Sequence, residues 1–240
     1  MTTPENRINI REDGALPFLV NSINGFKSKV YKEVIRAIRA CTISSKSTDN
    51  AKYFTQYNLL SEIEKRFAIE EDYEVLSDMA IIIGNCALDE QSREKMLIHG
   101  ILKKLIDLCR SSDEKVQSSS VCALANCAMS EKNQEVIRKA NLFPDIVEAL
   151  HSMNPYTRIG AILIIRNFAR IGSDSQSENW NLNVEKFLRL GVLEKLISLF
   201  NNFDQTLNDL VSETLEFLSK NSKIQKRLQE LISQEKSLEK

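Results

Sequence analysis

The sequence predicts an all-α protein, an α-solenoid of about five similar units, and three observations support this prediction. Two kinds of segment recur along the 240 residues at intervals of 41 to 50 residues. Glycine and proline are scarce, at 7 and 4 residues, whereas strand-rich folds need frequent turn residues. A repeat array also accounts for the length, because each unit packs only on its neighbours and no single large core is needed.

The first recurring segment is a short helix, a stop residue and a new helix. Glycine suits the left-handed residue after a helix end, and proline suits a helix start, as in Gly14-Ala-Leu-Pro17. In the other copies the stop position holds asparagine or glycine, and a weaker copy has tyrosine there. The five stop positions are Gly14, Tyr57, Gly100, Asn141 and Gly191.

The second recurring segment is a longer apolar helix that follows each stop. Its copies align without gaps, for example Ile82-Ile-Gly-Asn85-Cys-Ala and Ala123-Leu-Ala-Asn126-Cys-Ala. The intervals between successive copies of this helix agree closely with the intervals between the stop positions. Two unrelated patterns would rarely share the same intervals by chance. The aligned positions are Ala40, Asn85, Asn126, Asn167 and Phe217.

These segments resemble the armadillo repeat, whose pattern is a Gly-x-Leu-Pro second helix and an Ala-Leu-x-Asn third helix over about forty residues. The resemblance covers residues 6 to about 220 and implies a right-handed solenoid of three-helix units. The glycine-proline segment and the asparagines argue against the related HEAT repeat. The implied units lie near 6–46, 49–89, 90–130, 131–172 and 183–220, within an array over 1–220. Residues 221–240 are expected to form a C-terminal capping helix and charged tail.

Several local features refine this division. The polar stretch 172–182 has turn composition, so we expect a loop there between the fourth and fifth units. Ser111 and Glu114 have capping-box spacing. Asn154 before Pro155 fits a cap followed by proline at the first helical position.

Composition excludes some classes of function. The net charge of −1 and a pI near 6.2 give no electrostatic basis for nucleic-acid binding. The longest apolar runs are too short for membrane insertion, and residues 1–6 lack an apolar signal core. We therefore expect a cytoplasmic protein, with the nucleus as the alternative. The five cysteines are expected to be buried, reduced thiols.

Catalytic chemistry finds little support. The two histidines, His99 and His151, fall in different helix-end loops. Cys122 and Cys127 have no metal-ligand spacing, and a phosphate-binding glycine loop is absent. The sequence thus predicts neither an enzyme, a cofactor, a metal site nor a small-molecule substrate.

One set of residues suggests binding. The resemblance implies that third helices line a concave face, so that Asn85, Asn126 and Asn167 form a row along it. An amide offers two donors and an acceptor, and the family uses asparagines here to bind the backbone of an extended peptide. Alternatively, these amides only fix the stacking of units; both roles are compatible.

The neighbouring residues leave the type of ligand open. Importin-α relatives carry Trp four residues before the Asn, where this chain has Ile81, Cys122 and Leu163, so import-signal binding is not expected. These apolar residues suit an amphipathic helix as well as an extended segment. Nearby arginines suit an acidic or phosphorylated segment, or are solvated surface residues. They are Arg36, Arg39, Arg166 and Arg170.

The predicted function is therefore a non-catalytic protein-interaction scaffold whose concave groove binds a partner segment. The alternative is an architectural subunit of a larger assembly of ciliary, cytoskeletal or vacuolar type. Such a subunit would dock by its convex face or its C-terminal helix.

Overall fold

The computed structural model describes residues 3–25, 30–43, 50–175, 178–200 and 204–238. All regular secondary structure in these residues is helical. The helices divide between two compact units, residues 1–140 and 141–240. The predicted boundary between the first two repeats, at residues 46 and 49, lies outside the described residues.

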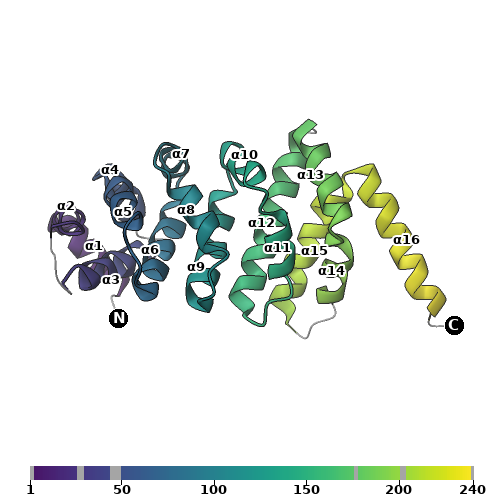
Figure 1. Ribbon diagram of the computed structural model, residues 1–240, viewed down its shortest axis with the longest axis horizontal. Coiled ribbons are helices and arrows are strands. Elements are labelled where there is room, and N and C mark those ends of the chain that lie inside the picture. Colours follow the sequence, from purple (N-terminus) through teal and green to yellow (C-terminus); the bar gives the residue numbers. More distant parts are fainter. Residues whose placement is uncertain (1–2, 26–29, 44–49, 176–177, 201–203, 239–240) are drawn as a thin grey trace. The chain divides into compact units, whose positions relative to one another are not determined.

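The first unit contains ten helices in its described residues (Figure 1). They are α1 (Pro4–Glu12), α2 (Ala15–Ser22), α3 (Val30–Thr42), α4 (Asn50–Gln56), α5 (Leu59–Phe67), α6 (Tyr73–Cys86), α7 (Glu90–Ile98), α8 (Ile101–Leu108), α9 (Glu114–Cys127) and α10 (Glu131–Lys139). The longest, α3, α6 and α9, lie next to one another, so that α6 packs between the other two (Figure 1).

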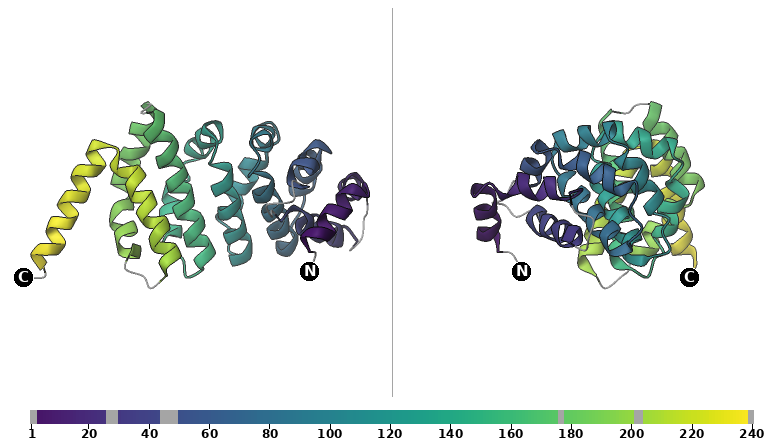
Figure 2. Two further views of the ribbon diagram at one scale, coloured as in Figure 1. Left: turned by 180° about the vertical axis from the view of Figure 1, so that it is seen from behind. Right: turned by 60° about the vertical axis from the view of Figure 1, so that its left-hand side comes forward.

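The second unit contains six helices in the residues that the structure describes. They are α11 (Phe143–Ala149), α12 (Pro155–Ser175), α13 (Glu178–Arg189), α14 (Val192–Phe200), α15 (Gln205–Ser219) and α16 (Ser222–Leu238). Here α12 and α15 lie side by side, and α16 packs on α13 and α15 before it extends away from them (Figure 2). We refer to α3, α6, α9, α12 and α15 as the third helices.

In each repeat, the first helix ends and the second begins around a residue that the sequence predicts to be left-handed, and most of these predictions are confirmed. Gly14 and Gly191 have φ of 73° and 68°, and Asn141 has φ of 51° in the place of a glycine. In the weak copy the left-handed residue is Asn58, with φ of 61°, so the prediction of Tyr57 was wrong by one position. Asparagine tolerates this conformation better than tyrosine does. Gly100 was also predicted to be left-handed, and this prediction is wrong because its φ is −35°.

Helix starts follow the capping rules, with one correction. Asn154 caps α12 as predicted, since its Oδ1 accepts hydrogen bonds from the backbone N–H groups of Tyr156 and Thr157. The cap of α9 is not the predicted Ser111 box. Asp113 caps this helix, because it lies directly before the first helical residue and its Oδ1 accepts from the backbone N–H groups of Lys115 and Val116.

The predicted loop at 172–182 is wrong for its described residues. The helix α12 continues to Ser175 and α13 begins at Glu178, so only residues 176–177 lie outside the description. Trp180 stabilises this extension, because its ring lies against Gly172, where a Cβ would come within 2.2 Å of the indole. Trp180, Val184 and Phe187 recur at helical spacing and are buried, a pattern that the polar composition of 172–182 masked.

Each unit buries apolar side chains. In the first unit α6 is buried on most of its surface, and Met79, Ile82 and Ile83 are fully buried. In the second unit the Phe143 ring contacts the rings of Phe168 and Phe187 edge-on, each at 5.1 Å between centroids, an arrangement that aromatic rings prefer.

Buried side chains also satisfy the carbonyls left at the ends of third helices. Arg93 donates to the carbonyl of Ala87, at 2.7 Å, and Gln134 donates to that of Ala128, at 2.9 Å. The two donors occupy the same position in successive first helices, α7 and α10. This contact ties each first helix to the preceding third helix.

Candidate functional site

The outward side of α6 and α9 is a partly exposed surface with a regular composition. Each helix has an asparagine near its end. An apolar residue lies four positions before this asparagine, and another lies three positions after it. All of these side chains are half-buried except Leu88, which is 47% exposed. We call this surface the amide face; its residues are Ile81, Asn85, Leu88, Cys122, Asn126 and Met129.

The two helices approach closely beneath the amide face. A Cβ on Gly84 would lie 3.0 Å from the Cα and 3.2 Å from the Cβ of Ala123. Glycine at 84 and alanine at 123 therefore allow nearly direct backbone contact. The close contact fixes Asn85 relative to Asn126.

Each of the two asparagines is held by a hydrogen bond to the preceding third helix. Asn126 Nδ2 donates to the carbonyl of Gly84 at 3.0 Å, and Asn85 Nδ2 donates to Thr42 Oγ1 at 3.2 Å. The Gly84 carbonyl falls among the last carbonyls of α6, which lack partners within the helix. These bonds agree with the stacking role that the sequence left as an alternative.

The bonds leave binding capacity on both amides. An asparagine side chain has two N–H donors and a carbonyl oxygen that can accept twice. Within the described residues, each of these two side chains makes only its single Nδ2 bond, and each is half-exposed. One N–H and the Oδ1 atom of each amide thus remain for a ligand, in an orientation that the other N–H fixes.

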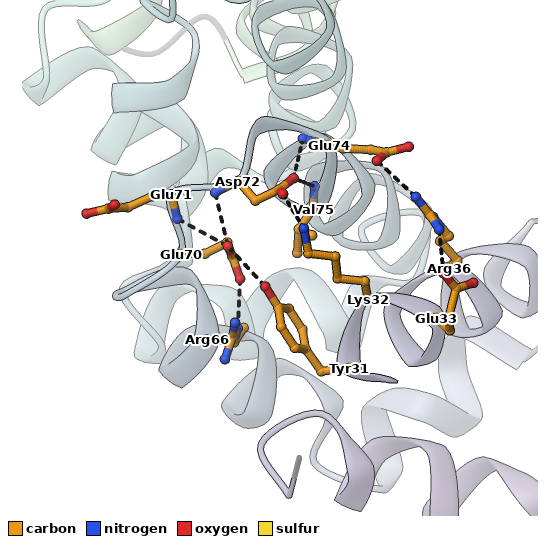
Figure 3. Close-up of polar contacts among 10 residues, drawn as sticks. All are labelled: Tyr31, Lys32, Glu33, Arg36, Arg66, Glu70, Glu71, Asp72, Glu74 and Val75. Carbon is orange, nitrogen blue, oxygen red and sulfur yellow. Dashed lines mark hydrogen bonds and ion pairs between the residues drawn. The ribbon is translucent and has the colours of Figure 1, made fainter. Parts of the chain in front are cut away.

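The predicted basic residues of α3 are paired with carboxylates of α6, and Figure 3 shows the pair of Arg36 with Glu74. Arg36 Nη2 lies 2.9 Å from Glu74 Oε2, and Arg39 Nη1 lies 2.8 Å from Asp78 Oδ1. Asp78 is 5% exposed, and its burial raises its pKa against the lowering effect of Arg39. The charges on this side of α3 and α6 are therefore largely balanced among themselves.

A second set of contacts fixes α3 to α5 and to the start of α6 (Figure 3). The Arg66 guanidinium lies 3.6 Å from the centroid of the Tyr31 ring, and its Nε donates to Glu70 at 2.8 Å. Lys32 pairs with Asp72, which caps α6 and whose pKa this lysine lowers. These contacts hold the N-terminal end of α6 against α3.

The predicted residues of the second unit lie on α12. Leu163, Arg166 and Arg170 are half-buried, and Arg166 pairs with Glu213 of α15 at 2.9 Å. Asn167 is 3% exposed, unlike Asn85 and Asn126. Its role in binding stays a prediction.

The histidines have ordinary partners. His99 Nδ1 lies 2.8 Å from Glu64 Oε2, and His151 contacts Lys195. In the described parts of the chain, no group of three or more His, Cys, Asp or Glu side chains could hold a metal ion.

The five cysteines are wholly or partly buried. Cys41, Cys86, Cys109 and Cys127 are buried, and Cys122 is half-buried. Burial raises the pKa of Cys86 and of Cys127 to about 12, and that of Cys122 to about 11. These thiols stay protonated at neutral pH and so lack the thiolate that nucleophilic chemistry needs.

None of the described helices is long and apolar enough to cross a membrane.

Sequence reasoning missed several residues of this surface. Leu88 and Met129 follow the asparagines by three residues, and this spacing was a usable signal for a shared face. The carboxylates that pair with the arginines were also missed. Glu74 and Asp78 are 38 and 39 residues from their partners, a separation that gives no local signal.

Residues 89–129, which contain α7, α8 and α9, match the family model described as Armadillo/beta-catenin-like repeat. No curated protein matches the chain. A solved structure of a designed armadillo repeat protein is similar with a TM-score of 0.76 at 22% identity, over 89% of this chain and 86% of that chain.

Two other solved structures share the fold. One is described as computationally designed armadillo repeat proteins for modular peptide recognition, with a TM-score of 0.73 at 21% identity. The other is a designed armadillo repeat protein in complex with the peptide (KR)4, with a TM-score of 0.73 at 22% identity. Each likeness covers 89% of this chain and 86% of the other. The predicted all-α solenoid is thereby confirmed.

Proposed function

We propose that this chain, whose residues 89–129 match the armadillo repeat and whose fold is similar to that of armadillo repeat proteins, is a non-catalytic scaffold whose third helices bind an extended segment of a partner protein. The observation that carries this proposal is the pair of amides on α6 and α9. Each is fixed through one N–H and keeps its Oδ1 atom and second N–H for a ligand.

The chemistry of binding follows from this arrangement. An extended segment has backbone N–H and C=O groups without internal partners, whereas a helix has already paired its own. Asn85 and Asn126 accept from the segment's N–H groups and donate to its C=O groups. Because their own contacts already hold both amides, little side-chain entropy is lost when the segment binds.

The comparisons support the class of ligand and no more. One similar structure is described as designed for modular peptide recognition, and another holds the peptide (KR)4. At 21–22% identity these likenesses concern the fold. Peptide binding by this chain is therefore our proposal, as are the five-unit division, the capping role of 221–240 and a cytoplasmic location. We also propose the second-unit residues as further contacts; they are Leu163, Arg166, Asn167 and Arg170.

The test is a selection of displayed random peptides on the whole chain, followed by titration of the selected peptides. We expect the Asn85→Ala/Asn126→Ala double variant to bind them about thirtyfold more weakly, since each of the two amides loses backbone hydrogen bonds worth roughly 1 kcal/mol in all. The measurement is fluorescence polarisation of labelled peptide, with circular dichroism to confirm folding.

Asn133→Ala is the matched control. This asparagine is fully buried, and its Nδ2 donates to the Cys127 carbonyl at 3.0 Å. The control therefore also loses an amide-to-carbonyl bond, but it changes nothing on the amide face. Equal binding by the double variant and the wild type would contradict the proposal.

The C-terminal helix supports the second candidate function, an architectural subunit. Ile224 of α16 is fully buried, and Arg227 contacts Glu194 at 2.6 Å. Further along α16, Ile232 is 50% exposed, and the end of this helix extends away from α15 (Figure 2). If this helix docks the chain into an assembly, Ile232→Glu will release the chain from that assembly in sedimentation. The amide-face double variant will not.

A further inference from the structure

The C-terminal halves of α6 and α9 carry no charge. Residues 79–88 and 116–130 contain no Asp, Glu, Lys or Arg, although charged residues form 27% of the chain. Together the two stretches contain all six residues of the amide face. A partly exposed surface without charge stands out in this protein, because exposed helix faces are ordinarily rich in charged residues.

Apolar side chains lie on both sides of the two amides. Ile81 and Cys122 precede the asparagines by four residues, and Leu88 and Met129 follow them by three. The last turn continues through these residues, since the N–H groups of Leu88 and Met129 donate to the carbonyls of Asn85 and Asn126. The two apolar rows are therefore separated by about 10 Å along the helix, at 1.5 Å per residue, with the amides between them.

The three basic side chains of α3 are already paired with carboxylates of α6 and of its cap. Lys32 pairs with Asp72, Arg36 with Glu74, and Arg39 with Asp78. A charged ligand side chain would have to compete with these pairs or be desolvated without a partner, which is costly. Neither an acidic nor a basic segment finds an opposite charge on the amide face itself.

We propose that the segment bound by α6 and α9 is extended, uncharged and aliphatic on both of its alternating sides. Successive side chains of an extended segment point in opposite directions. With its backbone on Asn85 and Asn126, one set of side chains contacts Ile81 and Cys122. The other set contacts Leu88 and Met129. This inference rests on the proposed function and adds the chemistry of the ligand.

A helical ligand fits this surface less well. A helix pairs its own backbone groups and presents side chains to its partner. An apolar helix face on Asn85 and Asn126 would cover their remaining amide groups without giving them a hydrogen-bond partner, which is unfavourable. The extended segment satisfies the amides and the apolar rows together.

The experiment compares three fluorescein-labelled peptides of equal length with the same Gly-Ser flanks. Their centres are Val-Leu-Val-Leu, Val-Glu-Val-Glu and Val-Lys-Val-Lys. We expect the first to bind the wild-type chain at least about tenfold more tightly than the other two, because its side chains bury apolar surface that charged ones do not.

Two variants locate the preference. Leu88→Glu, at a 47% exposed position just after α6, should lower the affinity for the Val-Leu peptide about tenfold. Ile98→Glu is the matched control, since this isoleucine is 81% exposed at the end of α7 and outside the amide face. It should bind like the wild type.

The outcomes separate the two proposals. If the Val-Glu or Val-Lys peptide binds as tightly as the Val-Leu peptide, and the asparagine double variant loses that binding, the inference is wrong and the proposed function stands. A helix-stapled apolar peptide that binds more tightly than the extended one would also overturn the inference. If no extended peptide binds, both proposals fail.

Discussion

The substitution Gly84→Ala tests the close contact beneath the amide face, where two opposing effects must be weighed. Alanine favours a helix interior over glycine by about 1 kcal/mol. The new Cβ, however, would lie 3.0 Å from the Ala123 Cα, a backbone atom that cannot rotate away, and 3.2 Å from its Cβ. Overpacking of this kind costs roughly 1–3 kcal/mol, so after the gain in helix propensity we expect a net loss of stability of about 1 kcal/mol.

The loss should extend to binding as well. Separation of α6 from α9 lengthens the 3.0 Å bond from Asn126 Nδ2 to the Gly84 carbonyl, which orients the amide. Urea unfolding of the whole chain, followed by circular dichroism, measures the stability. Peptide titration of the folded variant measures the affinity, which should fall.

Gly100→Ala provides the matched control for this experiment. Gly100 has a negative φ of −35°, and a Cβ there would meet only Glu64 Oε1, at 3.6 Å. We expect its stability to stay within about 0.5 kcal/mol of the wild type. If Gly84→Ala proves as stable as the wild type or more so, helix propensity outweighs the contact and the reasoning is refuted.

Two further predictions concern other parts of the chain. Burial raises the pKa of Asp78 above its ordinary value of 3.8, so the folded chain holds that proton more tightly than the unfolded chain. The wild type should therefore be most stable relative to Asp78→Asn below that value, and should lose this advantage as pH rises through the folded-state pKa. Urea unfolding of both proteins across acidic pH tests the sign, and a difference that does not vary with pH would contradict it. In the second unit, Gly172→Ala should displace the indole of Trp180, since the new Cβ would lie 2.2 Å from it. Trp180 is the single tryptophan, so a red-shifted emission reports its exposure, and unchanged emission would show that the contact is not tight.

Part of the candidate site could be predicted from the sequence. The aligned positions of Asn85 and Asn126 in two similar helices predicted that both would share one type of environment, and both are half-exposed. The same alignment did not distinguish Asn167, which is buried. The same residue in a similar motif acquires a different exposure when the surrounding side chains differ.

The roles of the arginines were not predictable. Arg36 and Arg39 suggested a basic surface because each was considered with its neighbours in the sequence. Their carboxylate partners come from the next third helix, about forty residues away. Packing of α3 on α6 brings them together, and our proposal of an uncharged ligand depends on this pairing.

The sequence by itself determined the helical class, the recurrence of similar segments and the left-handed stops at Gly14, Asn141 and Gly191. These features depend on residues within a few positions of one another, which act through backbone conformation and helical periodicity. Only the tertiary structure decided which groups meet. The bond from Asn126 to Gly84, the contact of Trp180 with Gly172 and the pairing of Arg39 with Asp78 all depend on how helices pack, which periodicity alone does not specify.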